Sequence, residues 1–479
     1  MFPGDVLLQV FDFCRLEASE SRDEHNYNWW CRLVHICQKW RQLIFTSPRR
    51  LDLQLFCTRK TPVRGILDFW PNIPIAINVK GWRSLNPTED NLLAAFEYSD
   101  RVWSVTLSLT QSQVEKVVEM MMKPFPALTN LRVKSFDTSN PWPWYLPHGF
   151  LGGSTSGLRE LDLSGISPLT LPSILSSSTD LVDLHLHNLH MTDDVSPEVM
   201  VASLAGMTKL KSLTIEFRYC LILPPNSMAQ VILPTLTHFR FRGSHGYLED
   251  LVAQLNTPQL FDLTVMFLVT STMLHDPVQQ LPQLLQFIDH AENLKLSQFR
   301  HAHAEIHDVH SFIHFDNAQT GQNPAYLTLG EVKYDEFHSN EFWPMGPLLS
   351  QVSAFISTVL HLSISPFHQQ IIQDNYWHHA GLLMLLHSFD TVKTLHVGGQ
   401  FTNIVPPLLN GLCDEVVTEV LPALCLLNFE GKPLKLVKEL LAPFIEKRQS
   451  NGCPSLTIVR THNVFKRLQA HIETDSDGG

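Results

Sequence analysis

The chain has 479 residues, of which 44% are hydrophobic and 17% charged, so it carries enough apolar side chains to bury a substantial core. Its formal net charge is −12, from 35 lysines and arginines against 47 aspartates and glutamates. Because nucleic-acid affinity rests mainly on cationic contacts with phosphates, this balance argues against a general nucleic-acid-binding protein.

Cysteine use and hydropathy indicate the compartment. The eight cysteines are widely spaced and form no C-x-x-C pair, so a dense disulfide framework is not indicated. The first residues lack the basic and then apolar pattern of a signal peptide. No uncharged apolar stretch reaches the ~18 residues that span a bilayer. These features predict a cytoplasmic or nuclear protein without membrane insertion.

The first predicted element is a short amphipathic helix. Pro3 can open it, because the N–H that proline lacks would be unpaired in the first turn anyway. The apolar residues that follow share one helical face, which Leu8 extends. They are Val6, Leu7, Leu8, Val10, Phe11 and Cys14.

A polar loop is predicted from Arg15 to Asn28, and a second helical stretch from near Trp29. Ser47-Pro48 ends that stretch, because the residue before proline avoids the α region. Two or three such helices in fewer than ~50 residues can hardly bury their whole apolar surface. The apolar surface left exposed either docks on a partner or merely caps the part of the chain that follows.

Two stretches of this module resemble an F-box. They are residues 2–11 (FPGDVLLQVF) and 33–43 (LVHICQKWRQL), and the continuation at 47–53 and 70–75 is similar to fungal F-box proteins with leucine-rich repeats. The resemblance covers roughly residues 1–80. It departs from the family at Phe2, where leucine is usual, and in the long loop at 15–28.

The resemblance implies docking on a Skp-type adaptor and, through it, on a cullin. By the same resemblance, the adaptor-binding residues are Pro3, Val6, Leu7, Leu8, Val10, Phe11, Leu33, Ile36 and Trp40. Some of them must instead hold the helices together, and the sequence does not separate the two roles.

From about residue 100 onward the phrase L-x-x-L-x-L recurs, with aliphatic or aromatic variation. Seven copies start at Val102, Leu128, Leu158, Leu181, Leu210, Leu236 and Leu260. Their spacing of roughly 20–30 residues is typical of leucine-rich repeats. Weaker copies start at Ala291, Val359, Val392 and Leu424, and short strands are expected at 75–79 and 326–329.

Such a repeat predicts an α/β solenoid, in which each unit has a short strand and a return segment. Thr110–Met122, for example, has valines at helical spacing. One unit cannot bury its own apolar face, so neighbouring units bury each other's. The expected fold is therefore a short helical F-box followed by a leucine-rich-repeat solenoid. Its curved parallel sheet would lie on the concave side, with helices and loops on the convex side.

The residues between the repeat leucines are expected to face outward from the sheet. Solenoids bind targets on such faces, although a merely solvated surface is the simpler interpretation. Arg132 with Asp162, and Glu216 with Arg242, could instead form exposed ion pairs between neighbouring strands, worth little. The candidate substrate-binding residues are Arg132, Glu160, Asp162, Asp183, His185, Thr214, Glu216, His238, Arg240 and Arg242.

Signatures of catalysis are missing from the sequence. The glycine-rich segment at 152–157 lacks the phosphate-binding lysine, and neither G-x-S-x-G nor H-E-x-x-H occurs. On a helix, His303, His307, His310 and His314 would share a face able to hold a metal. The alternative is a polar face or loop above buried Ile306, Val309 and Ile313. We expect no metal and no cofactor.

The predicted organisation is an F-box at 1–47, a repeat array at 48–465 with an atypical first unit at 48–100, and a polar tail at 466–479. The predicted function is a non-enzymatic subunit that docks on a ubiquitin ligase and holds an unknown protein substrate. The alternatives are an interaction scaffold that acts outside any ligase, and a hydrolase or metalloenzyme built on the histidine segment.

Overall fold

The computed structural model describes residues 3–20, 29–47, 51, 53, 55–57, 63–67, 73–80, 86–135, 143–153, 155–190, 196–218, 230–269, 281–294, 299–306, 310–317, 325–333, 356–366, 377–399, 401–412, 414–430 and 433–461. Contacts group the chain into two compact units. Unit 1 comprises Met1–Val195 and Ala202–Arg218, and unit 2 comprises Ser196–Val201 and Tyr219–Gly479. The predicted tail at 466–479 lies outside the described residues.

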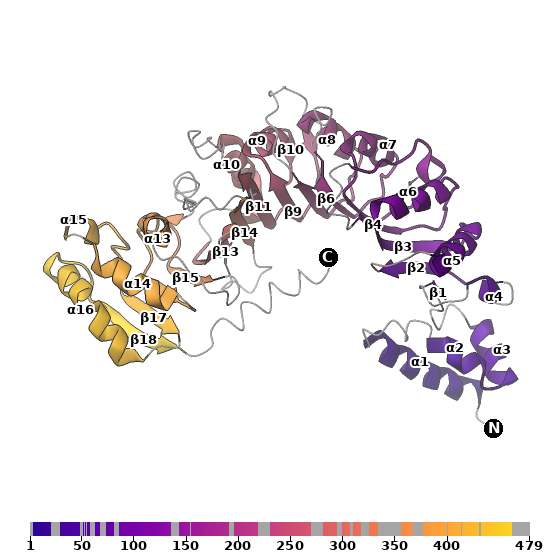
Figure 1. The fold of residues 1–479 in the computed structure, drawn as a ribbon, viewed down its shortest axis with the longest axis horizontal. Coiled ribbons are helices and arrows are strands. Elements are labelled where there is room, and N and C mark those ends of the chain that lie inside the picture. The colour runs from indigo at the N-terminus through magenta and orange to yellow at the C-terminus, as the bar shows by residue number, and fades with distance from the viewer. Residues whose placement is uncertain are drawn as a thin grey trace. The chain divides into compact units, whose positions relative to one another are not determined.

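Unit 1 begins with three helices, α1 (Gly4–Glu20), α2 (Trp29–Val34) and α3 (Gln38–Thr46) (Figure 1). The predicted loop from Arg15 is therefore wrong as far as Glu20, because α1 continues through these polar residues. The second helical stretch does begin at Trp29, but a turn at 35–36 divides it in two. An edge-to-face contact between Phe11 and Trp40, with ring centroids 5.0 Å apart, joins the first helix to the third.

The sheet of unit 1 is parallel, and its strands follow one another in chain order. Every strand except the first was expected from the sequence, because each of them coincides with a copy of the repeat phrase or with the segment 75–79. The strands are β1 (Leu55–Cys57), β2 (Ile75–Lys80), β3 (Val102–Leu109), β4 (Asn130–Ser135), β5 (Glu160–Ser164), β6 (Asp183–Leu189) and β7 (Ser212–Phe217).

Burial alternates along β4 and β6 as the repeat predicts, whereas in β5 the polar residues Asp162 and Ser164 are buried as well. In β4, Leu131 and Val133 are buried, whereas Arg132 between them is half-buried on the other face. The helix predicted over 110–122 is α6 (Gln111–Met120), where Thr110 and Gln113 form a capping box and Val114 packs inward. The other helices of this part are α4 (Val63–Leu67), α5 (Asn86–Glu97), η2 (Phe150–Gly153), η3 (Pro168–Thr170) and α7 (Leu171–Leu175), while the residues of α8 (Pro197–Leu204) are divided between the two units.

The strands of unit 2 are mostly parallel, in the order β9-β11-β14-β13-β12-β15-β16-β17-β18. The pairs β12–β13 and β13–β14 are antiparallel. The strands are β9 (His238–Gly243), β11 (Asp262–Val269), β12 (His301–Ile306), β13 (His310–Asp316), β14 (Tyr326–Lys333), β15 (His361–Pro366), β16 (Thr394–Val397), β17 (Leu426–Glu430) and β18 (Thr457–Thr461). A separate small pair joins β8 (Val231–Ile232) to β10 (Leu255–Asn256).

The weaker repeat copies are also strands where they are described. Those starting at Val359, Val392 and Leu424 become β15, β16 and β17. The copy at Ala291 is different, because its second position forms part of a short 3-10 helix, η5 (Glu292–Leu294), and Leu296 lies outside the described residues. β18 coincides with no predicted copy of the repeat phrase.

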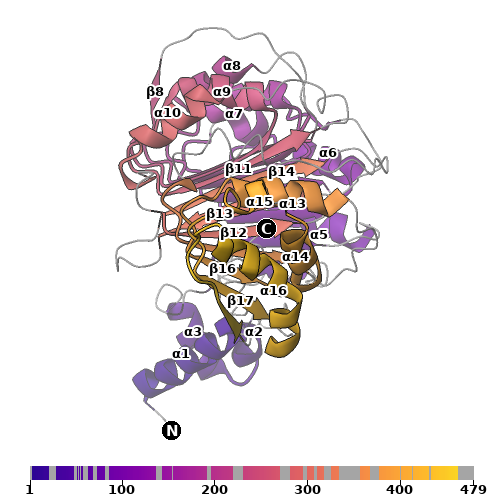
Figure 2. The same cartoon turned by 90° about the vertical axis from the view of Figure 1, so that its left-hand side faces the viewer.

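Helices cover one face of the sheet in unit 2. Both views show α9 (His245–Ala253) and α10 (Pro282–His290) together (Figure 1, Figure 2), and α9 contacts α10 and β9. Farther along the chain, α14 (Phe401–Asn410) contacts β15, β16 and α16 (Leu434–Ser450). The remaining helices are α13 (Trp377–His387) and α15 (Asp414–Val417).

The described part of the chain is thus a mixed α/β fold with mostly parallel sheets that do not close into a barrel, an arrangement compatible with a repeat solenoid. Within the described residues, none of the helices has both the length and the apolar character needed to cross a bilayer.

Candidate functional site

Helix α1 has two apolar faces with different surroundings. Leu7, Leu8 and Phe11 are buried against their own chain. Val6, Val10 and Phe13, by contrast, have exposed fractions of 40%, 43% and 73%. Residues at i, i+4 and i+7 lie on one side of an α-helix, so these three side chains form a continuous exposed strip, here named the α1 stripe.

The structure therefore divides the predicted adaptor-binding residues into two groups. Leu7, Leu8 and Phe11 are buried among other residues of the chain, and their predicted role as adaptor contacts stays a prediction. Pro3 is exposed, and Ile36 in the turn between α2 and α3 is 57% exposed. Leu33 and Trp40 are half-buried.

Phe13 is the most exposed of these apolar side chains and was absent from the predicted set. The first stretch that resembles an F-box ends at Phe11, so it offered no position for Phe13. The spacing of seven residues from Val6 was the available signal, since two helical turns separate residues of one face.

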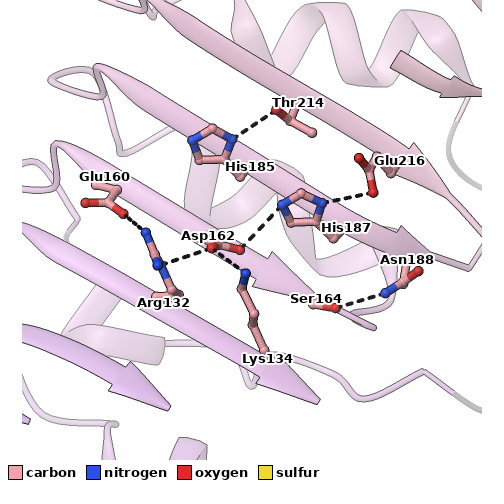
Figure 3. Close-up of polar contacts among 10 residues, drawn as sticks. All are labelled: Arg132, Lys134, Glu160, Asp162, Ser164, His185, His187, Asn188, Thr214 and Glu216. Carbon is pink, nitrogen blue, oxygen red and sulfur yellow. Dashed lines mark hydrogen bonds and ion pairs between the residues drawn. The ribbon is translucent and has the colours of Figure 1, made fainter. Parts of the chain in front are cut away.

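The second candidate surface is the polar face of β4–β7 in unit 1 (Figure 3). Strand register places its residues in rows. One row runs from Arg132 through Asp162 and His185 to Thr214. The polar lattice, as we name it, comprises Arg132, Lys134, Glu160, Asp162, His185, His187, Thr214 and Glu216 (Figure 3).

Asp162 is the centre of the lattice, with a side chain only 4% exposed. Its Oδ2 lies 3.1 Å from Arg132 Nε and 3.3 Å from Lys134 Nζ. The ion pair between Arg132 and Asp162, which the sequence offered as an alternative, is present, although its carboxylate is buried rather than exposed. A buried carboxylate needs nearby compensating charge, and these two cations supply it in the sheet face.

The neighbouring groups are tied to one another in the same way. Arg132 Nη2 donates to Glu160 Oε1 at 2.8 Å. Burial alone would raise the pKa of Glu160, but the hydrogen bonds from Arg132 and Asn130 outweigh it and hold that pKa below its usual range. Burial lowers the pKa of His185, whose Nδ1 lies 2.9 Å from Thr214 Oγ1.

Two members of the lattice were outside the predicted binding set. Lys134 and His187 each lie two residues beyond a predicted member, and the alternation of side chains along a strand was the signal that could have found them. Of the predicted members, Asp183 begins β6 in register with Glu160.

The remaining predicted residues belong to β9 in unit 2. His238 and Arg240 are exposed and Arg242 is half-buried. The ring of His238 meets Phe261 edge to face, with centroids 4.7 Å apart. The structure places these three side chains on β9, and we describe them apart from the polar lattice of unit 1.

The described part of the histidine segment forms two antiparallel strands, β12 and β13, so the helical arrangement that would put its histidines on one face is not present in the described residues. His303 pairs in register with His314 across the two strands. His303 Nε2 lies 3.1 Å from Glu305 Oε1, and His314 Nδ1 lies 2.9 Å from Thr328 Oγ1. His307 is outside the described residues. Among those described, no three or more histidines, cysteines or carboxylates are placed to hold a metal ion.

The chemistry of the two surfaces is that of binding. The α1 stripe offers apolar area, and the polar lattice offers pre-arranged hydrogen-bonding groups of both charges. Compared with known proteins, the chain matches no protein-family model and no curated protein.

Proposed function

We propose that the protein is a non-catalytic substrate receptor of a Skp–cullin–F-box ubiquitin ligase. In this proposal α1–α3 act as the F-box that docks on a Skp-type adaptor, and the strands behind them form a leucine-rich-repeat array that holds a target protein. The observation that carries the proposal is the α1 stripe, because it leaves apolar side chains exposed on the module that resembles an F-box.

An exposed apolar strip suits a partner better than solvent. Large apolar side chains that cluster on a surface mark interaction sites more often than isolated ones do. Binding energy also concentrates in a few central side chains, and Phe13 is the largest side chain of the stripe. A cap for the repeat array would need these residues covered by their own chain, whereas Val6, Val10 and Phe13 are not.

The repeat array supplies the second half of the function. Its apolar positions are buried between neighbouring repeats, and polar positions on the opposite face of its strands form the polar lattice. A receptor of this kind raises the concentration of a target near the enzyme that transfers ubiquitin, and needs no catalytic group of its own. The cytoplasm and nucleus are the compartments in which we expect this activity.

Val10→Asp tests the docking surface. We expect the full-length variant to lose Skp-adaptor binding by about 30-fold or more, because a carboxylate replaces a central apolar contact. Its helical content and unfolding midpoint should stay unchanged, since Val10 is exposed. The measurement is calorimetric titration of purified protein with adaptor.

Gln42→Asp on α3 is the matched control, because Gln42 is also exposed and the substitution adds the same charge to the same module. Adaptor binding by the control and not by the Val10 variant supports the proposal. If the unmodified protein does not bind adaptor at micromolar concentration, the proposal is wrong and an interaction scaffold outside the ligase takes its place.

Leu7→Asp distinguishes interior residues from contact residues. Leu7 is 5% exposed, so we expect its replacement to unfold the three helices rather than to remove a contact alone. Circular dichroism of the full-length variant, together with the protease sensitivity of residues 3–47 within it, reports this. A variant that keeps its helices intact while losing adaptor binding would place Leu7 in the interface instead.

A further inference from the structure

Two arginines of β9, Arg240 and Arg242, lie on the face of the strand that is turned away from the core. The residues that alternate with them, Phe239 and Phe241, are buried. Arg240 is exposed and Arg242 is half-buried. Side chains two residues apart on a strand are separated by about 7 Å, so the two arginines leave β9 in the same direction as close neighbours.

Neither arginine is compensated by an acidic side chain. Among the residues that the structure describes, Arg240 and Arg242 form no ion pair, and the buried Nε of Arg242 donates no hydrogen bond. Arg132 on β4 is the opposite case, because it is bonded to both Glu160 and Asp162 (Figure 3). A guanidinium group has five N–H donors and no acceptor, so those of β9 can bind an anion from outside the chain.

The neighbouring strand β11 places a hydroxyl group, and no carboxylate, in register with the two arginines. Thr264 is opposite Arg240, and Met266 is opposite Arg242. Asp262, the carboxylate of β11, is in register with the histidine of β9 instead. Thr264 is half-buried, and its hydroxyl can donate a hydrogen bond to an anion that is bound by Arg240.

We propose that Arg240 and Arg242 bind an extended acidic segment of the target protein, with two carboxylates at alternate positions. The inference rests on the proposed function, because it assigns a substrate class to the proposed repeat array. Charge complementarity selects the occupant. An acidic segment supplies the acceptors that both guanidinium groups lack, whereas a basic segment would be repelled.

The spacing of the arginines selects the arrangement of the acids. In an extended peptide, alternate side chains are also separated by about 7 Å, so each carboxylate can face one arginine. One carboxylate accepts two parallel N–H bonds from one guanidinium group, a geometry that the point charge of lysine does not offer. A segment with acids at every second position therefore fits both arginines at once.

The test uses the full-length protein and three fluorescent peptides of equal length. One alternates glutamate with serine, one alternates lysine with serine, and one is a serine peptide with a single phosphoserine. Anisotropy titrations are run in about 0.1 M salt, where the Debye length is about 10 Å. We expect the glutamate peptide to bind most tightly. Because the formal net charge of the chain is −12, unspecific attraction would favour the lysine peptide instead.

Variants locate the site. Arg240→Met and Arg242→Met are each expected to weaken the glutamate peptide about tenfold, and Arg242→Lys to recover part of that loss. The unfolding midpoints should stay unchanged, because neither arginine holds an acceptor of the described chain. Arg460→Met on β18 is the matched control. Arg460 is an exposed strand arginine in register with the buried Phe429, on the other face of the strands, and its loss should leave binding unchanged.

Equal binding of the glutamate and lysine peptides, or full affinity in the variant that lacks both arginines, overturns the inference. Tighter binding of the phosphoserine peptide than of the glutamate peptide overturns the carboxylate pair as the occupant. Adaptor titrations on the same preparations separate the inference from the proposed function. A protein that binds adaptor but not the glutamate peptide contradicts only the substrate class, whereas one that binds the peptide but not adaptor contradicts only the ligase role.

Discussion

Replacing Arg448 with methionine is expected to destabilise unit 2 by about 3–5 kcal/mol. Arg448 lies near the end of α16 and is 1% exposed. Its Nη1 donates to Leu421 O at 3.1 Å, and its Nη2 donates to Pro422 O at 3.1 Å and Leu424 O at 3.2 Å. These carbonyls belong to the loop that enters β17.

The loss is large because methionine removes only one side of these hydrogen bonds. Methionine fills a similar volume, but the loop carbonyls remain and lose the donors that satisfied them. Leu421 also has a positive φ of 48°, an unfavourable conformation for leucine that the surrounding contacts must hold. The hydrogen bonds of the guanidinium therefore hold this loop in its conformation.

Urea unfolding of the full-length variant measures the change, with hydrogen exchange in β17 as the local readout. Lys438→Met is the control, since Lys438 is an exposed cation on the same helix and its loss should stay within about 0.5 kcal/mol. Equal stability of the two variants would show that the loop holds its conformation without Arg448.

Replacing Gly330 with alanine is expected to destabilise unit 2 by about 2–3 kcal/mol. Gly330 on β14 pairs with Met266 on one side and Phe312 on the other. A Cβ at this position would lie 2.6 Å from Phe312 Cβ, 2.7 Å from Met266 Sδ and 2.8 Å from Ser311 O. The methionine can move aside, but a Cβ and a backbone oxygen cannot do so without shifting β13.

Gly246→Ala in α9 is the matched control for this overpacking. No atom lies within 4 Å of the position where its Cβ would be, so alanine should be neutral or stabilise the helix by up to about 1 kcal/mol. Urea titration compares the two unfolding midpoints. The midpoint of Gly330→Ala should fall, whereas that of Gly246→Ala should stay the same or rise. A Gly330 variant as stable as the control would mean that β13 adjusts freely.

Much of the fold was predictable because its signals are local. The phrase starting at Leu128 placed β4 correctly, since alternation within six residues decides which side chains are buried. The helix after Thr110 was predictable for the same reason. The pairing of Arg132 with Asp162 followed from two adjacent copies of one phrase, because the repeat sets the register between neighbouring strands.

The histidine segment shows where local signals compete. His303 and His314 lie at a spacing that suits a helix, yet Ala302 and Ala304 alternate with histidines as in a strand. The antiparallel pairing of β12 with β13 resolves this, because it buries both alanines with Ile313 on the core face. That pairing joins two separate strands, and no single-segment pattern contains it.

The amino-acid sequence by itself determined where the strands of the repeat phrase lie, that their repeat leucines are buried and which polar residues share a face, because these depend on periodicity within short segments. Only the tertiary structure decided which apolar residues of α1 face inward and that His187 stands between Asp162 and Glu216. Packing and strand register bring together groups that are distant along the chain, and the distances between them depend on every intervening element.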